Sequence, residues 1–405
     1  MRTLTHSPVR TSPYPSWPQY GPEELAGLTD VLESGIWSDA NGPAVQAVEA
    51  AYAEFVQAEH AVAVTNGTVA IVLALRALGI GAGDEVIVPP YTFLATATAV
   101  LEVNALPVFV DIDPDTWCID PDAVEAAITE RTRAIIPVHL GGHPADLDRL
   151  QDIATRHGLS VIEDCAHAHG SIWKDRRVGS IGDLGTWSFQ ASKNLNCGEG
   201  GMVTTKNAEL AETIESLRNC GRKKGGLWYA HYIMSGNFRL TEWQSTVLHC
   251  QLNRYPDQLA LRDSNGKYLD SQLSQIEGIA PLKRDSRTTV HAYHLYQFRY
   301  DAEAFGGLEK SEFITRVRAE GIPVTAGYPL PLYKQPLFFE HQFDTKAIGY
   351  DPSYRPTQFE TLNLPVCESA CANGVWIPQT VLLENQAGMN DIVEAIHKVQ
   401  SAARA

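Results

Sequence analysis

The sequence predicts an α/β protein with a mostly parallel central sheet flanked by helices and a smaller α+β domain at the C-terminal end. Two observations predict this fold class. Between residues 60 and 165, short apolar segments alternate with amphipathic ones, which is typical of buried parallel strands joined by helices. After Leu252 the pattern changes, and 405 residues are more than a single hydrophobic core usually holds.

The elements of the N-terminal half follow in order. Apolar residues at helical spacing predict a helix over 22–35 and a second one over 43–56. Apolar runs bounded by Gly, Pro, Asn or Asp predict buried strands, at 61–65, 85–89, 106–112, 134–140 and 159–164. The segments between these strands predict helices, at 68–79, 92–103, 121–128 and 145–157. Because ligands bind beyond the carboxyl ends of parallel strands, the residues that follow each strand are the places to search for a site.

The C-terminal part has a different organisation. A long helix is expected over 252–276, and YHLYQFRY (293–300) alternates like a strand. Two shorter helices are expected at 310–320 and 390–405. GYPLPLYKQPLF (327–338) contains several prolines, which predict a loop that forms a lid or a pocket wall.

Three regions result from these patterns. Residues 1–20 carry four prolines and are expected to form an extended N-terminal arm. Residues 21–255 form the predicted large domain, and residues 256–405 form the predicted small domain.

Composition excludes several classes of protein. A net charge of −16, with Arg222–Lys224 as the longest basic cluster, argues against a nucleic-acid partner. No stretch approaches the roughly 20 apolar residues of a membrane-spanning helix, and the N-terminus has no signal-peptide core, so no membrane partner is expected. The seven cysteines are scattered and odd in number, which favours a reducing cytoplasm over a disulfide framework. Cys367 and Cys371 are the only close pair, and without a second pair we expect buried thiols and no metal site.

Four features could carry chemistry, and each has an ordinary alternative. Asp164 ends a hydrophobic strand, where a carboxylate needs a cation, although a helix cap or a structural ion pair would also explain it. Gly67 and Thr68 stand where a strand gives way to a helix, whose free N–H groups can hold a phosphate or simply be capped. Phe93 follows another strand and could stack on a flat ligand or pack in the core.

Lys193 is the fourth feature. It lies in SFQASKNLNCGEGG (188–201), among small, amide and apolar residues. A lysine buried in such surroundings has a lowered pKa and becomes nucleophilic, whereas most single lysines are solvated surface residues. A phosphate-binding helix start, an aromatic ring, a strand-end aspartate and a reactive lysine in this order match one cofactor, pyridoxal phosphate (PLP). The aspartate keeps the pyridine nitrogen protonated, and the lysine holds the aldehyde.

With these four features in this order, the chain resembles the DegT/DnrJ/StrS sugar aminotransferases, within the fold-type I PLP enzymes. The resemblance lies in VTNGTVAIVLALRALGIGAGDEVIVPPYTF, VIEDCAHAHG, SFQASKNLNCGEGG and GNFRL, and covers roughly residues 20–255. YHLYQFRY and YPLPLYKQPLF extend it into the small domain. PSWPQYGPEE (15–24) and EDCAHAHG (163–170) resemble the branch of glutamine:scyllo-inosose aminotransferases and aminohydroxybenzoate synthases, which acts on cyclitols and related antibiotic precursors.

The resemblance implies a role for each residue. Lys193 would be the Schiff-base lysine, and Asp164 would hold the pyridinium nitrogen. His167 would contact the phenolic oxygen of the cofactor, where many members have Gln. The remaining cofactor contacts would come from the phosphate ligands Gly67, Thr68 and Ser188, from Phe93 on the ring, and from Asn237 and Arg239, which would reach the phosphate of the neighbouring subunit.

The same resemblance implies an obligate homodimer with shared sites and a transfer of an amino group from L-glutamine or L-glutamate to a keto-cyclitol or keto-sugar. Tyr333 replaces the histidine that the family usually has in the small-domain loop, and we expect it to contact substrate. Some members with His in place of the lysine act as dehydratases, so a PLP-dependent dehydratase or an aromatising synthase is the alternative. A non-catalytic DNA-binding regulator would need a basic patch or a helix-turn-helix extension, and the acidic chain has neither.

Overall fold

The computed structural model describes residues 7–38, 42–349, 353–354 and 358–405. Its centre is a seven-stranded sheet in the order β1-β9-β8-β5-β4-β2-β3. The strands are β1 (His60–Val64), β2 (Glu85–Val88), β3 (Leu106–Phe109), β4 (Thr132–Ile135), β5 (Ser160–Asp164), β8 (Leu184–Ser188) and β9 (Gly201–Thr205). Only β9 pairs antiparallel with its neighbours, so the predicted mostly parallel sheet is confirmed.

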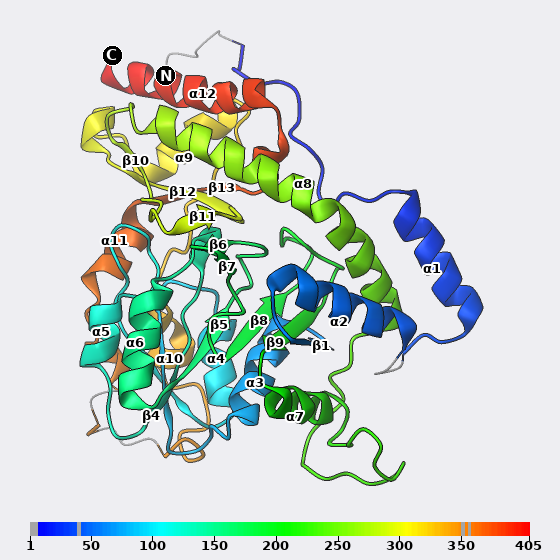
Figure 1. The fold of residues 1–405 in the computed structure, drawn as a ribbon. Helices are drawn as coiled ribbons and strands as arrows, with labels where there is room; N and C mark the ends of the chain where they lie inside the picture. Colours follow the sequence, from blue (N-terminus) through cyan, green and yellow to red (C-terminus); the bar gives the residue numbers. More distant parts are fainter. Residues whose placement is uncertain (1–6, 39–41, 350–352, 355–357) are drawn as a thin grey trace.

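Helices cover both faces of this sheet (Figure 1). One face packs against α3 (Gly67–Ala77), α4 (Ala95–Glu102) and α7 (Ala208–Arg218), and their side chains share one apolar core. The other face packs against α2 (Pro43–Val56), α5 (Pro121–Ala126) and α6 (Leu147–His157) in two further cores. Because these strands are covered on both faces, the side chains on both faces are mostly apolar. This is why most of the strands are continuous apolar runs in the sequence.

Two further helices, α1 (Pro22–Ser34) and α8 (Glu242–Leu273), lie beside the sheet and the helices that cover it. α1 packs on α8 at the edge of the molecule (Figure 1). α8 begins ten residues before the predicted start at Leu252, because Thr241 and Gln244 form a capping box at its N-terminus. The predicted start was therefore wrong, and Pro256 lies inside the helix without ending it. α8 also runs without interruption through the predicted domain boundary at 255/256, and that boundary stays a prediction.

The C-terminal part has its own apolar core. A three-stranded antiparallel sheet has the order β10-β12-β13 and is covered by the second half of α8 and by two further helices (Figure 1). The bounds are β10 (Ile279–Pro281), β12 (Leu295–Tyr300), β13 (Gly374–Pro378), α9 (Lys310–Ala319) and α12 (Gln386–Arg404). The remaining strands and α-helices of the described residues are β6 (Ile172–Trp173), β7 (Arg176–Arg177), β11 (Thr288–Val290), α10 (Pro336–Phe339) and α11 (Pro365–Asn373).

The N-terminal arm, as far as the structure describes it from residue 7, contains neither helix nor strand up to α1. Arg10 binds Glu384 and Asp391 with N–O distances of 2.7 and 2.8 Å, which ties the arm to α12. Trp17 donates its indole N–H to the carbonyl of Ala191 at 2.9 Å. The first six residues of the predicted arm lie outside the described residues. Among the described helices, none is long and apolar enough to span a bilayer.

Candidate active site

Lys193 lies in the loop between β8 and β9. Main-chain hydrogen bonds close this loop: the N–H of Lys193 donates to Gln190 at 2.8 Å, and that of Ala191 donates to Gly198 at 2.9 Å. The side chain is half-buried, and burial lowers the pKa of its amine to about 8, although the charge of Asp164 acts in the opposite direction. About a tenth of the amine is therefore uncharged at pH 7 and about half at pH 8, far more than for an ordinary lysine, and the uncharged amine is the form that a nucleophile or base requires.

Asp164 is the last residue of β5 and is buried. One carboxylate oxygen accepts a hydrogen bond from the Thr96 hydroxyl at 2.8 Å, and the other accepts one from the Ala166 amide at 3.1 Å. Burial raises the pKa of this carboxyl group above its ordinary value. Asp164 neither caps a helix nor forms an ion pair with any described residue, so the two ordinary explanations of its position do not apply. A cation of suitable shape would stabilise this carboxylate.

Three histidines lie near Lys193, and their partners define their tautomers. His167 accepts a hydrogen bond from the Gly141 amide on Nδ1 at 3.3 Å, so its hydrogen is on Nε2. Burial lowers the pKa of His167 well below its ordinary value, and the ring stays neutral. His169 bonds Ser188 O through Nε2 at 2.9 Å and so holds the end of β8. His294 contacts the His167 ring, with centroids 4.3 Å apart. Neutral His167 therefore offers an N–H donor, the chemistry that a phenolic oxygen needs.

The phosphate turn lies at the N-terminus of α3. Asn66 caps this helix by accepting the Val69 N–H at 2.9 Å, and the amides of Gly67 and Thr68 form no hydrogen bond with any described residue. Gly67 touches Ser188 so closely that a Cβ on Gly67 would stand 2.7 Å from the Ser188 Cβ. Two free amides at the positive end of a helix dipole, next to a hydroxyl, suit a phosphate.

Gly67→Ala should therefore weaken PLP binding. The added methyl group must push Ser188 away, and overpacking of this kind costs about 1–3 kcal/mol, or about 5- to 150-fold in the dissociation constant if it falls on the bound state. Equilibrium titration of the apo-enzyme with PLP measures the effect. Gly81→Ala is the matched control, because its Cβ would meet only the Val103 carbonyl, at 3.5 Å. Equal affinities for the two variants would contradict a role of the Gly67–Ser188 contact in phosphate binding.

Three other predicted cofactor contacts lie at the surface of the single chain. Phe93 is 61% exposed just before α4. Asn237 is exposed, and Arg239 donates to the Asn219 side chain at 2.9 Å. The main chain of Arg239 forms an antiparallel β-bridge with Val64 at the end of β1. This segment therefore lies beside the strand that leads into the phosphate turn. Contact of Asn237 and Arg239 with a second subunit stays a prediction.

Among the described residues, Tyr333 contacts a part of the chain that is separate from the surroundings of Lys193. It is buried in the apolar core with Phe109, and its hydroxyl donates to Glu368 at 2.6 Å. Its substrate role stays a prediction. For Tyr328, in the same loop, burial and then the charge of Asp164 raise the pKa of the phenol above its ordinary value.

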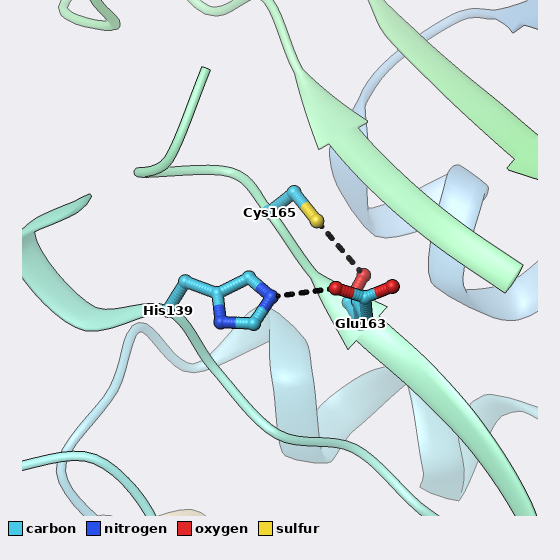
Figure 2. Close-up of side chains that lie close together, drawn as sticks. All are labelled: His139, Glu163 and Cys165. Carbon is cyan, nitrogen blue, oxygen red and sulfur yellow. Dashed lines mark hydrogen bonds and ion pairs between the residues drawn. The ribbon is translucent and has the colours of Figure 1, made fainter. Parts of the chain in front are cut away.

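A buried polar network adjoins Asp164 in the chain, and Figure 2 shows its members His139, Glu163 and Cys165. The carboxylate of Glu163 is fully buried and accepts hydrogen bonds from the amides of Gly179, Ile181 and Gly182 at 2.7–2.8 Å. His139 Nε2 lies 3.0 Å from the same carboxylate. Burial alone would raise the pKa of Glu163, but these hydrogen bonds outweigh it and the pKa is lowered. The His139 amide donates to the Asp164 carbonyl at 3.1 Å, so the network also fixes the backbone of Asp164.

His139, Glu163 and Cys165 are also the kinds of residue that bind metals, and their ligand atoms lie within 4.8 Å of one another. His139 accepts the Ala145 amide on Nδ1, so its Nε2 carries the hydrogen that points at Glu163. Burial raises the pKa of Cys165 well above its ordinary value, which keeps the thiol protonated. The lone pairs that a cation needs are thus engaged, and we interpret the cluster as a hydrogen-bonded support.

Glu163→Gln should lower the free energy of unfolding by about 3 kcal/mol, because an amide NH₂ would face the buried N–H groups that the carboxylate now accepts. Urea denaturation measures this, with the exposed Glu199→Gln as the control. Dialysis against a chelator should leave the unfolding midpoint of the unmodified protein unchanged. A midpoint that falls with chelation would establish the metal site instead.

The fold and this site together define a class of protein. A buried carboxylate, a desolvated lysine, a neutral N–H donor and free amides at a helix start fit the pyridinium nitrogen, aldehyde, phenolic oxygen and phosphate of PLP. They gather at the carboxyl edge of a mostly parallel sheet, as in PLP-dependent transferases. The chain belongs to the DegT/DnrJ/EryC1/StrS aminotransferase family, whose sequence profile matches residues 18–397. It is a PLP-dependent aminotransferase, and the predicted family, activity and cofactor are confirmed.

Its relatives cover nearly the whole chain. An L-glutamine:2-deoxy-scyllo-inosose aminotransferase of Streptoalloteichus tenebrarius is 39% identical over 97% of this chain and 96% of its own length. The crystal structure of 3-amino-5-hydroxybenzoic acid synthase aligns with a TM-score of 0.87 at 34% identity and covers 97% of this chain and 99% of that one. The structure of S. venezuelae DesV aligns with a TM-score of 0.81 at 35% identity, over 95% of each chain.

Proposed function

We propose that this enzyme transfers an amino group from L-glutamine or L-glutamate to a keto-cyclitol or keto-sugar, in the biosynthesis of an aminocyclitol or aminosugar antibiotic. The observation that carries the proposal is the near full-length similarity to the scyllo-inosose aminotransferase, in a chain that keeps a desolvated lysine at the site. The bound cofactor supplies an aldehyde that links to Lys193 and a ring that takes up electrons.

The residues of this chain then have defined roles. Lys193 Nζ takes the proton from the α carbon of the amino donor, and in the second half of the reaction it delivers a proton to the carbon that becomes the amine carbon of the product. Asp164 holds the pyridinium proton by charge, and His167 donates its Nε2–H to the phenolic oxygen. Gly67, Thr68 and Ser188 hold the phosphate, and Phe93 covers the ring.

The proposal includes a cytoplasmic homodimer in which Asn237 and Arg239 reach the phosphate of the partner. All seven cysteines are free, which suits a reducing compartment. Exposed apolar side chains gather just before Asn237, at Leu227, Trp228, Tyr229 and Met234. Surfaces of this kind usually lie against a partner. Light scattering of the purified enzyme tests the dimer, and Asn237→Ala should weaken PLP binding.

A donor and acceptor screen tests the reaction. The PLP form is mixed with each amino acid, conversion to the pyridoxamine form is followed by absorbance, and keto-cyclitols and keto-sugars are then added. Conversion by glutamine or glutamate, followed by recovery of the PLP form with a keto-cyclitol, is the expected result. Recovery with 2-oxo acids alone would contradict the proposed acceptor.

The similarity to 3-amino-5-hydroxybenzoic acid synthase favours one alternative, a PLP-dependent dehydratase or aromatising synthase on the same scaffold. Mass spectrometry of the product separates the two. Transamination of a keto-cyclitol retains every hydroxyl group, whereas dehydration or aromatisation removes water.

A further inference from the structure

Asn194, which follows Lys193 in the chain, is 1% exposed, and its side chain can take only one orientation. The amide Nδ2 donates to the carbonyl of Ala292 at 2.7 Å, and a carbonyl can only accept. Oδ1 of Asn194 therefore faces His294, 3.0 Å from its Nδ1. Because Oδ1 has no hydrogen, the hydrogen of this bond belongs to His294 Nδ1.

His294 lies at the edge of the other sheet. It immediately precedes β12, and Ala292 is two residues before it, so both bonds of Asn194 join the lysine loop to the C-terminal sheet. The His294 ring is 8% exposed and lies against the His167 ring. Burial, and then the charge of Lys193, lower the pKa of His294 well below its ordinary value, so the imidazole remains neutral.

We propose that His294 is a positioning residue for the transamination: its Nδ1–H holds Asn194, and through Asn194 it holds the backbone of Lys193, so that the amine stays in its desolvated place beside Asp164. The proposal rests on the role given to Lys193 under the proposed function. Loss of the bond leaves the buried Oδ1 of Asn194 without a donor, and the lysine loop has to move or admit water to satisfy it. Water at the amine stabilises the ammonium form, and a displaced amine reacts more slowly.

The test uses the apo-enzyme and PLP, without any amino donor or ketone. The rate of covalent attachment of PLP to Lys193 is measured by absorbance as a function of pH. In the unmodified protein the rate should rise with pH and level off above about 8, since only the uncharged amine attacks the aldehyde. The titratable groups that face Lys193 are Asp164, His167, His169 and His294, and the histidines remain neutral over this range.

His294→Phe keeps a ring and removes the donor. In the pH–rate profile of this variant, we expect the inflection to lie about one pH unit higher and the plateau rate to be about tenfold lower. In His294→Asn the amide nitrogen is bonded to Cγ, as Nδ1 of histidine is, and can donate from nearly the same place. This variant should recover most of the original inflection pH and most of the plateau rate. Asn194→Ala removes the acceptor together with the bond to Ala292, so it should shift the profile at least as far as His294→Phe does. The double variant should add little to Asn194→Ala, because the bond between the two side chains is then already lost. The matched control is His291→Asn, because His291 is a buried histidine of the same segment that stacks on Tyr293 and, among the described residues, makes no hydrogen bond or ring contact with the lysine loop.

Two results would overturn the proposal: an unchanged pH profile in His294→Phe, or equal losses in His294→Asn and His294→Phe, which would reduce the role to ring packing. If His294→Phe does not fold, Asn194→Ala and His294→Asn still decide the matter from the two ends of the bond. Lys193→Ala distinguishes a failure of the His294 proposal from a failure of the role given to Lys193. If PLP still attaches covalently to that variant at the unmodified rate, the role of Lys193 itself fails, whatever His294 does.

Discussion

Replacing Lys193 with alanine is expected to abolish transamination and the covalent attachment of PLP. General acid–base catalysis by one group contributes about 10²- to 10⁴-fold, and loss of the lysine also removes the nucleophile, so turnover should fall by at least about 10⁴-fold. Borohydride reduction followed by mass spectrometry should find the cofactor mass on the peptide that contains Lys193 in the unmodified enzyme and on no peptide of the variant. The apo-variant should fold, because it loses only an amine that burial disfavours.

Two further variants sharpen this test. Lys206→Ala, an exposed lysine just after β9, is the control and should retain activity and cofactor attachment. Lys193→His replaces the amine with an imidazole, which cannot form an imine with the aldehyde, so it should lose transamination without forming the covalent link. A Lys193→Ala enzyme that aminates its ketone at the original rate would refute the assignment.

The sequence predicted the sheet best where each strand is bounded by chain-breaking residues. β2 begins after Gly83–Asp84 and ends before Pro89–Pro90, and the structure has it at Glu85–Val88. β8 and β9 were not predicted, because LGTWS and GMVTT contain glycine, serine and threonine and have no apolar run. They are buried by neighbours distant in sequence, and tertiary packing of this kind overrides local preference.

In the candidate site, too, some residues could be predicted from the sequence and others could not. Asp164 and Gly67 could be proposed from the sequence because they stand at predicted strand ends, and Lys193 because its neighbours are small, amide and apolar residues. His167 and Ser188 came from the family resemblance. The structure brings these residues together at one edge of the sheet. Thr96, Asn194 and His294 could not, because each acts through a partner at least 68 residues away in the chain. Nothing near His294 in the sequence distinguishes it from any other histidine beside a strand. Its role depends on the approach of two sheets, which only the folded structure shows.

Replacing Asp164 with asparagine is expected to cost the enzyme its activity without costing the apo-enzyme its stability. Asparagine has the same shape: its oxygen can accept the Ala166 amide, and its NH₂ can donate to the Thr96 hydroxyl, which has Thr92 as an alternative partner at 3.2 Å. A neutral amide cannot stabilise a pyridinium, so turnover should fall by about 10²- to 10⁴-fold, the range that a missing proton contributes.

The stability follows from the sign of the pKa shift. Burial raises the pKa of Asp164 in the folded apo-protein above its unfolded value, so the folded state binds the proton more tightly. The stability of the apo-protein therefore falls as pH rises from the unfolded pKa to the folded one, and the full penalty is present at neutral pH. The asparagine side chain has no charge to bury, so Asp164→Asn should unfold at an equal or higher urea concentration than the unmodified apo-protein at pH 7. At about pH 3, below both the folded and the unfolded pKa of Asp164, the difference should vanish.

Loss of activity with retained or increased apo-stability separates a cofactor residue from a structural one, because a structural carboxylate would cost stability when neutralised. Asp183→Asn supplies that comparison: Asp183 accepts the Val161 amide at 2.8 Å and lies outside the site, so its variant should keep cofactor affinity and turnover. PLP should also protect the unmodified enzyme against urea more than it protects Asp164→Asn, since the pyridinium relieves the buried charge only where a charge exists. Equal protection of both would mean that Asp164 does not face the cofactor nitrogen.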